Sequence, residues 1–121
     1  MEVWNNDECS KCAAARGTLE EADIAYTVRD YLANPPTAAE FDDVLTRLGA
    51  EPWEVARLNE PVADDLGLAD APRDRAHWIE VMVANPVLIQ RPILLLDDGS
   101  ALIGRSVEAL RRAIAVPGAS H

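Results

Sequence analysis

The sequence predicts an α/β fold with a small mixed sheet, in the order strand–helix–strand, helical insert, strand–strand–helix. Strand-like stretches at residues 1–4 and 24–31 flank an amphipathic helical pattern. Residues 37–84 carry only helix signals. Two further strand-like runs, 93–96 and 101–103, are separated by a hairpin turn and followed by a last helix. We therefore expect one domain over residues 1–121, with a helical insertion at about 37–84.

The opening strand–helix–strand unit is indicated by its spacing of apolar residues. Met1 to Trp4 ends in an apolar pair, and a polar turn follows before a helix from about Ser10. One face of that helix carries apolar side chains at spacings of three and four residues, at Cys12, Ala15, Leu19 and Ala22. The stretch from Ile24 to Tyr31 is rich in β-branched and aromatic residues, as strands are. Both cysteines therefore lie at the first strand-to-helix turn.

Capping residues and glycines mark the first helix of the insert. Pro35 and Pro36 end the preceding segment, and Thr37 with Glu40 forms a capping box. Gly49 is a suitable C-terminal stop. Between these limits the apolar stripe consists of Phe41, Val44, Leu45 and Leu48.

Prolines mark the remaining helices of the insert. Pro52 is expected to open a short helix that runs through Arg57, and residues 66–68 resemble the end of another. Pro72 is expected to open a further helix that ends at Asn85–Pro86. The apolar face of this helix consists of Trp78, Ile79, Met82 and Val83.

The C-terminal part returns to strands. The continuously apolar run Ile93–Leu96 is typical of a strand buried on both faces. Asp97–Gly99 is a hairpin turn that leads into Ala101–Ile103. Ser106 can cap the last helix, whose apolar face consists of Val107, Leu110 and Ile114.

The charge balance excludes several classes of partner. Among 121 residues, 21 are acidic and 11 are basic, so the formal net charge is −10. Binding to nucleic acid or to an anionic membrane relies on clustered cations, so neither partner is expected. Lys11 is the single lysine, and the other ten cations are arginines, which suit bidentate contacts with oxyanions. The hydrophobic content of 49% is enough for a buried core.

The chain shows no signal for export or membrane insertion. No apolar run approaches the ~18 residues that span a bilayer. The N-terminal residues lack the basic and apolar regions of a secretory signal. We therefore expect a cytoplasmic protein, in which paired cysteines are more often catalytic, redox-sensing or metal-binding than structural.

Cys9 and Cys12 form a C-x-x-C motif at the start of a predicted helix. Free amides and the helix dipole at that position favour a thiolate at Cys9, and Cys12 is one helical turn away. A zinc site is not expected, because only His77 and His121 could add ligands. A structural disulfide would close too short a loop to remove much chain entropy. Redox or nucleophilic chemistry is favoured over a pair of inert thiols.

Five strings, taken in order, carry a resemblance to a known family. They are Cys9 in its turn, Tyr31–Thr37, Ala56–Glu60, Asn85–Ile93 and Ile103–Ser106. Together they resemble the arsenate reductases of the glutaredoxin-dependent kind, a group that also includes the Spx-type regulators. The similarity extends from Val3 to about Ile114.

The resemblance implies a thioredoxin-like fold with a helical insert, and it implies roles for individual residues. Cys9 would attack arsenate, and Arg57, Arg91 and Arg105 would bind the oxyanion, whose acceptor oxygens match guanidinium groups. A cis peptide bond would precede Pro92. No cofactor is expected to be bound. Glutathione or a similar small thiol would be the reductant, together with a glutaredoxin-like or thioredoxin-like protein.

The chain also departs from this family around the cysteine. Asn5 stands where those reductases have a histidine, and it cannot carry charge. The carboxylates of Asp7 and Glu8 precede Cys9 and disfavour a thiolate. The second cysteine, Cys12, is similar to the C-x-x-C redox switch of the Spx-type regulators.

Three functional hypotheses follow. The first is an arsenate reductase-like oxidoreductase in which Cys12 or an external thiol resolves the linkage on Cys9. The second is an Spx-like regulator without catalysis, whose Cys9–Cys12 disulfide controls binding to a protein partner such as RNA polymerase. The third is a family member that reduces another oxyanion or a disulfide. Each arginine also has a simpler interpretation as a solvated surface cation.

Overall fold

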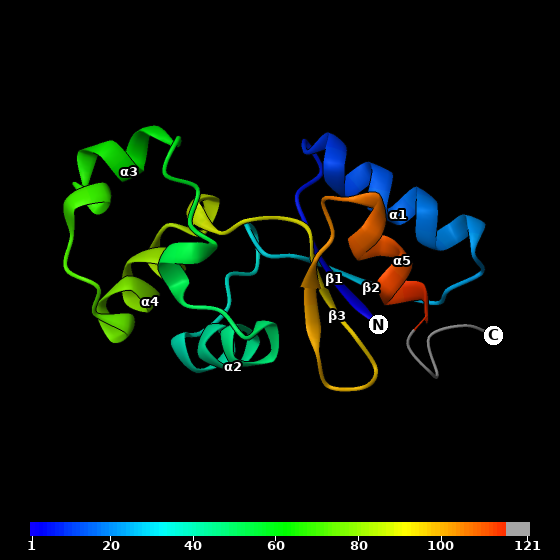
Figure 1. Ribbon diagram of the computed structural model, residues 1–121. Coiled ribbons are helices and arrows are strands. Elements are labelled where there is room, and N and C mark those ends of the chain that lie inside the picture. Colours follow the sequence, from blue (N-terminus) through cyan, green and yellow to red (C-terminus); the bar gives the residue numbers. More distant parts are fainter. Residues whose placement is uncertain (116–121) are drawn as a thin grey trace. The chain divides into compact units, whose positions relative to one another are not determined.

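The computed structural model describes residues 1–115, and these belong to two compact units (Figure 1). The sheet unit comprises Met1–Asn34 and the chain from Arg91 onward, and the helical unit comprises Pro35–Gln90. The predicted helical insertion at 37–84 lies within the helical unit. No helix of the described residues is both long and apolar enough to cross a membrane.

The sheet unit contains a four-stranded mixed sheet in the order β2-β1-β3-β4. Its strands are β1 (Glu2–Asn5), β2 (Thr27–Asp30), β3 (Ile93–Leu95) and β4 (Ala101–Ile103). β1 pairs parallel with β2 and antiparallel with β3, and β3 pairs antiparallel with β4. The predicted small mixed sheet is thereby confirmed.

The second strand is shorter than the predicted stretch from Ile24 to Tyr31. Asp23 adopts a left-handed conformation with φ of 57°, and the Ile24 N–H bonds back to the Leu19 carbonyl at 2.9 Å. Ile24 is therefore tied to the end of the preceding helix and lies before the first residue of β2. Pairing begins at Thr27, whose N–H donates to the Met1 carbonyl at 3.0 Å.

Two helices pack on one face of this sheet, α1 (Ser10–Glu21) and α5 (Val107–Ala115) (Figure 1). Their buried side chains meet those of β1 and β3 in one core, formed by Val3, Ala15, Leu19, Ile24, Leu94, Leu96, Leu110 and Ala113. Ile93 and Leu94 are adjacent, point to opposite faces and are both fully buried, so β3 is covered on both faces as predicted.

The predicted hairpin and last cap are also present. Gly99 has a φ of +90°, which glycine adopts without strain, and the Leu96 N–H donates to the Ser100 carbonyl at 2.9 Å. Ser106 Oγ accepts a hydrogen bond from the Ala109 N–H at 3.0 Å and so caps α5.

The helical unit consists of α2 (Ala38–Leu48), α3 (Pro61–Asp65) and α4 (Arg75–Ala84). Three single-turn 3-10 helices connect them: η1 (Pro52–Glu54), η2 (Leu68–Asp70) and η3 (Pro86–Leu88). The capping box of α2 is confirmed, with Glu40 N–H to Thr37 Oγ1 at 3.1 Å and Thr37 N–H to Glu40 Oε1 at 2.9 Å. Gly49 ends α2 with a φ of +67°.

Two helices of the insert have other bounds than the sequence predicts. The helix expected from Pro72 begins at Arg75, because the Pro72 carbonyl instead accepts bonds from the Asp74 N–H at 2.9 Å and Trp78 Nε1 at 2.8 Å. The helix expected to run from Pro52 through Arg57 is the single turn η1. Beyond it the Arg57 N–H donates to the Leu88 carbonyl at 2.7 Å, which holds this segment extended.

We predict that Thr37→Ala lowers the free energy of unfolding by about 1 kcal/mol, because the Glu40 amide loses its capping acceptor. Urea denaturation monitored by circular dichroism measures the change. Thr37→Ser is the matched control, since it keeps the hydroxyl. Equal stability of Thr37→Ala and Thr37→Ser would show that the box does not stabilise α2.

Candidate functional site

Cys9 occupies the turn that connects β1 to α1. It is the N-cap of α1, with extended backbone angles of −95° and 120°, and its side chain is 9% exposed. The Cys9 N–H donates to the Asn6 carbonyl at 3.0 Å, and the Cys9 carbonyl accepts from the Ala13 N–H at 3.2 Å. The turn therefore fixes the sulfur beside the free amides of the first helical turn.

The surroundings of Cys9 favour its thiolate. Burial raises the pKa of the thiol, but hydrogen-bond donors outweigh it: the Cys12 amide, the Arg91 guanidinium, the Cys12 thiol and the Lys11 amide. The pKa falls from 9.0 to about 7. The sulfur makes no capping bond of ordinary geometry. The amides therefore act on its charge without forming a regular cap.

Cys12 lies in the opposite environment, on the buried face of α1. Its side chain is fully buried, and the Asn6 N–H donates to its sulfur at 3.5 Å. Burial, together with the neighbouring Cys9, raises the pKa of this thiol to about 11, although the Asn6 amide and Arg91 act in the opposite direction. Both thiols are free. At neutral pH the pair therefore consists of one partly ionised thiol and one protonated thiol.

The loop before β3 brings two of the predicted arginines together. Arg91 contacts the Cys9 thiol, and Arg105 Nη1 donates to the Arg91 carbonyl at 2.9 Å. The Arg91–Pro92 peptide bond is cis, the geometry that the family resemblance implies. The Gly104 N–H donates to the Pro92 carbonyl at 2.9 Å. A Cβ at Gly104 would lie 3.1 Å from Leu94 Cδ1, so this close approach of the two segments suits glycine.

Arg57 lies in the helical unit and is held by side chains of that unit. Its Nε is 3.2 Å from Glu60 Oε1, and its Nη1 donates to Gln90 Oε1 at 3.1 Å. The guanidinium is half-buried rather than a solvated cation on a helix face. Its assignment to an oxyanion stays a prediction from the resemblance.

The residues before Cys9 place their charges toward solvent. Asp7 and Glu8 are exposed, and Asp7 Oδ1 accepts a hydrogen bond from Asn5 Nδ2 at 2.9 Å. Asn6 Oδ1 accepts one from the Glu8 N–H at 2.9 Å. The pKa of Cys9 is lowered despite these two carboxylates, because the donors near the sulfur are closer to its charge.

Asn6 is a residue of the site that the sequence did not indicate. Its main chain contacts both cysteines, through its carbonyl to the Cys9 N–H and through its N–H to the Cys12 sulfur. Main-chain contacts leave no signature in the residue type, so no sequence pattern could have found this role.

The structure gives no support for a metal site. Within residues 1–115 no group of three His, Cys, Asp or Glu side chains could hold a metal ion. His77 is exposed on α4, and His121 lies outside the described residues.

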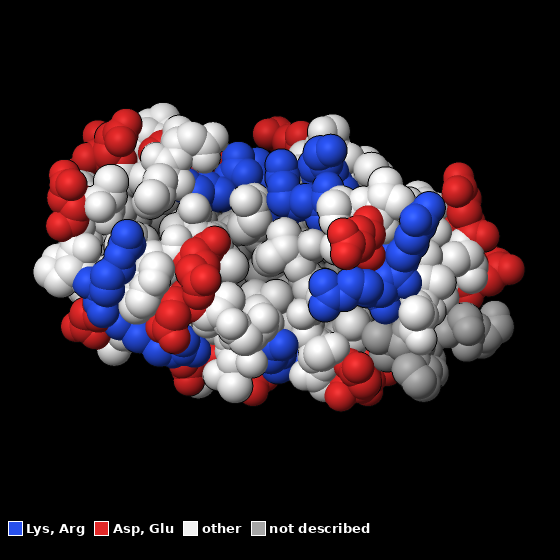
Figure 2. All heavy atoms as spheres, viewed as in Figure 1, with Lys and Arg blue, Asp and Glu red and all other residues white. Residues whose placement is uncertain are grey.

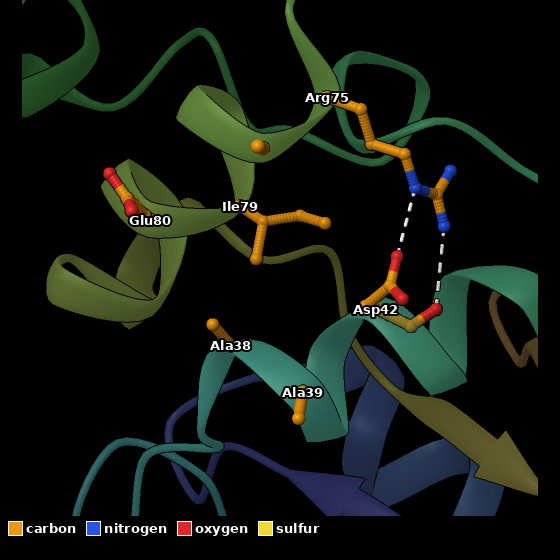
Figure 3. A pocket seen from close by; sticks show the side chains of 7 residues that line it. Ala38, Ala39, Asp42, Arg75, Ile79 and Glu80 are labelled. Carbon is orange, nitrogen blue, oxygen red and sulfur yellow. Dashed lines mark hydrogen bonds and ion pairs between the residues drawn. The ribbon is translucent and has the colours of Figure 1, made fainter.

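Each unit also has a hollow on its surface. In the helical unit a hollow of about 450 Å³ lies between α2 and α4. Arg75 spans its edge and donates to Asp42 Oδ1 at 2.9 Å (Figure 3). It also donates to Glu51 Oε1 at 3.1 Å. Alanines and Ile79 form its apolar part (Figure 3). In the sheet unit a hollow of about 440 Å³ is lined by residues of the turn before Cys9.

Comparison with known proteins places these features in a family context. Residues 4–113 match the ArsC family. An uncharacterized protein in the glnII region of Streptomyces viridochromogenes is 45% identical over 94% of this chain and 98% of its own. An arsenate reductase of Neisseria meningitidis is 34% identical over 89% of this chain and 92% of its own.

Solved structures agree with the predicted thioredoxin-like architecture. The structure of an arsenate reductase from Vibrio cholerae matches with a TM-score of 0.85 and 30% identity, over 93% of this chain and 98% of that chain. The α/β fold class is thereby confirmed over nearly the whole chain.

We predict that the rate of Cys9 alkylation by iodoacetamide rises with pH through a midpoint near 7, because only the thiolate reacts. Cys12 stays protonated and buried over that range. Arg91→Gln should move the midpoint upward, toward the ordinary thiol value of 9.0. Mass spectrometry of quenched samples measures the rate at each pH.

Arg112→Gln is the control for this measurement, because Arg112 is exposed on α5 and makes the same change of charge. It should leave the midpoint in place. A wild-type midpoint close to 9, or equal shifts in both variants, would contradict the assigned role of Arg91.

Proposed function

Because the chain belongs to the ArsC family, we propose that it is a thiol-dependent oxidoreductase that reduces arsenate or a related oxyanion. The observation that carries this proposal is the Cys9 thiol, with a pKa of about 7, in contact with the Arg91 guanidinium. A thiolate beside a guanidinium can receive an anionic electrophile, which a thiolate alone would repel.

Cys9 is the proposed nucleophile. Its thiolate attacks the arsenic centre, a sulfur–arsenic bond forms, and one arsenate oxygen leaves as water after protonation. The lowered pKa supports this role, because it increases the share of Cys9 that is thiolate at neutral pH. The N-terminal end of α1 stabilises the same negative charge.

Arg91 and Arg105 are the proposed oxyanion ligands of the sheet unit. The hydrogen bond from Arg105 Nη1 to the Arg91 carbonyl supports a joint role, since it ties the Arg105 side chain to the main chain of the loop that carries Arg91. Guanidinium groups match the tetrahedral acceptor oxygens of arsenate in geometry and charge. We carry Arg57 over as a third ligand on the strength of the family resemblance alone.

The linkage on Cys9 must then be resolved by a second thiol. The second thiol attacks the Cys9 sulfur and forms a disulfide with it. The electron pair of the broken sulfur–arsenic bond passes to arsenic, which leaves as arsenite. The full burial and raised pKa of Cys12 favour an external small thiol, such as glutathione, for this attack. A glutaredoxin-like or thioredoxin-like protein in the cytoplasm would reduce the resulting disulfide. No bound cofactor is required.

The close pair of free thiols also supports the second hypothesis, an Spx-like regulator. Oxidation to a Cys9–Cys12 disulfide would then change affinity for a protein partner, without turnover. Partner binding that depends on redox state, in a protein that releases no arsenite, would favour this function over the first.

We predict that the protein releases arsenite from arsenate only when a thiol donor is present, and that Cys9→Ser abolishes release. Chromatographic separation of arsenate and arsenite after incubation with varied donors measures the turnover. Cys12→Ser should keep activity with a small external thiol, because that thiol, rather than Cys12, is the proposed resolving group. Activity unchanged by Cys9→Ser would refute the proposed nucleophile.

A second prediction concerns Arg105. Loss of one charged hydrogen bond to the oxyanion, about 1.5–3 kcal/mol, should lower kcat/KM of Arg105→Gln by at least about tenfold. Initial rates at varied arsenate concentration measure the change. Arg111→Gln on the exposed side of α5 serves as the charge-matched control and should keep wild-type kinetics. An equal loss in both variants would assign the effect to net charge.

A further inference from the structure

Asn5 is a buried polar residue at the end of β1, and the proposed reaction does not use it. Its side chain is only 1% exposed. Because side chains alternate along a strand, Asn5 lies on the same face of β1 as Val3, which packs in the core against α1. A polar side chain buried at this place needs a hydrogen-bond partner.

The partner of Asn5 is the carboxylate of Asp7, to which Asn5 Nδ2 donates at 2.9 Å. An ionised carboxylate can only accept, so the amide nitrogen must face it and Asn5 Oδ1 lies on the other side of the amide group. Within residues 1–115 this buried Oδ1 accepts no hydrogen bond. A carboxylate at position 5 would therefore leave a buried charge without a donor. The position suits a neutral side chain that carries a donor.

The Asn5–Asp7 hydrogen bond spans Asn6, the residue whose main chain contacts both thiols. The Asn6 carbonyl accepts the Cys9 N–H at 3.0 Å, and the Asn6 N–H donates to the Cys12 sulfur at 3.5 Å. A bond between the side chains on either side of Asn6 restricts the main chain between them. Asn5 is therefore connected to the cysteine pair through a single turn of main chain.

From these contacts we propose that Asn5 is a positioning residue for the nucleophile Cys9. Its buried amide holds the Asp7 carboxylate and thereby fixes the turn that follows β1. The fixed turn keeps Cys9 at the N-cap of α1, where the helix amides stabilise its thiolate. The inference rests on the proposed function, because it takes Cys9 as the nucleophile. This role requires no charge on Asn5.

Loss of the Asn5–Asp7 bond should reduce the amount of Cys9 thiolate. The lowered pKa of Cys9 depends on amides of the first turn of α1, and hydrogen bonds from these amides weaken when the sulfur moves out of line. Once the turn is released, the Cys9 N–H is no longer held on the Asn6 carbonyl. Arg91 is the charged side chain that contacts Cys9, and it belongs to another loop. The midpoint of Cys9 ionisation should therefore move upward while Arg91 is unchanged.

Two substitutions of Asp7 separate the hydrogen bond from the charge. Asp7→Asn and Asp7→Ala both remove one carboxylate, so both change the net charge near Cys9 equally. Only the asparagine keeps a side-chain oxygen that can accept from Asn5 Nδ2. Asp7 is exposed, so neither variant should unfold the protein. The measured quantity is the pH midpoint of Cys9 alkylation by iodoacetamide, with circular dichroism to verify the fold.

The midpoint of Asp7→Asn should lie at or below that of the wild-type protein, because removal of a carboxylate favours the thiolate. The midpoint of Asp7→Ala should lie at least about 0.5 pH unit above that of Asp7→Asn. In an Asn5→Ala background the two variants should have the same midpoint, since the donor is absent. If Asn5→Ala does not fold, the comparison at Asp7 decides the proposal.

Glu8 provides the matched control pair, Glu8→Gln and Glu8→Ala. Glu8 is also exposed, and among the described residues its carboxylate accepts no hydrogen bond, so the two variants should share one midpoint. Equal midpoints of the two Asp7 variants, an equal gap in the Glu8 pair, or a gap that persists in Asn5→Ala would each overturn the proposal and leave Cys9 as the nucleophile. A wild-type midpoint close to 9 would overturn both.

Discussion

The chemistry of the protein depends on the charge that the start of α1 can stabilise on one buried sulfur. Burial alone would keep Cys9 protonated, so its pKa of about 7 requires donors that outweigh the loss of water. Helix amides supply part of this effect, and the Arg91 guanidinium and the Cys12 thiol supply the rest. Arg91 lies in the loop before β3. The Pro92 carbonyl of this loop accepts a hydrogen bond from the Gly104 N–H, and the Arg91 carbonyl accepts one from Arg105 Nη1. Because β1 and β3 are neighbours in the strand order β2-β1-β3-β4, the turn after β1 and the loop before β3 lie side by side.

The same logic explains how an acidic protein can handle an anion. A net charge of −10 repels oxyanions at a distance, and Figure 2 shows acidic side chains gathered over α3. At short range, individual contacts decide, because the guanidinium beside Cys9 acts through far less solvent than the exposed carboxylates. Asp7 and Glu8 therefore do not prevent ionisation of Cys9.

Local signals in the sequence predicted most of the fold. The capping box at Thr37, the left-handed stop at Gly49 and the apolar run of β3 depend on neighbouring residues only, and all three are present. The predictions that failed depend on hydrogen bonds that the helix signals do not reveal. Pro72 does not begin a helix because its carbonyl accepts Trp78 Nε1, and the segment after Pro52 leaves the helix to pair with Leu88. The candidate site could also be predicted only where the signal was local. The C-x-x-C motif located Cys9, whereas Arg91 and Arg105 were predicted from the family resemblance. Asn6 could not be predicted, because it acts through its main chain.

Protection of Cys9 by oxyanions tests most directly whether the arginines recruit an anion to the thiolate. Alkylation of Cys9 by iodoacetamide, a neutral reagent, is measured at fixed ionic strength with arsenate, phosphate, sulfate or chloride present. The account predicts saturable protection by arsenate in the wild-type protein, little protection by chloride, and loss of arsenate protection in Arg105→Gln but not in Arg111→Gln. Equal alkylation rates with arsenate and chloride in the wild-type protein would contradict it.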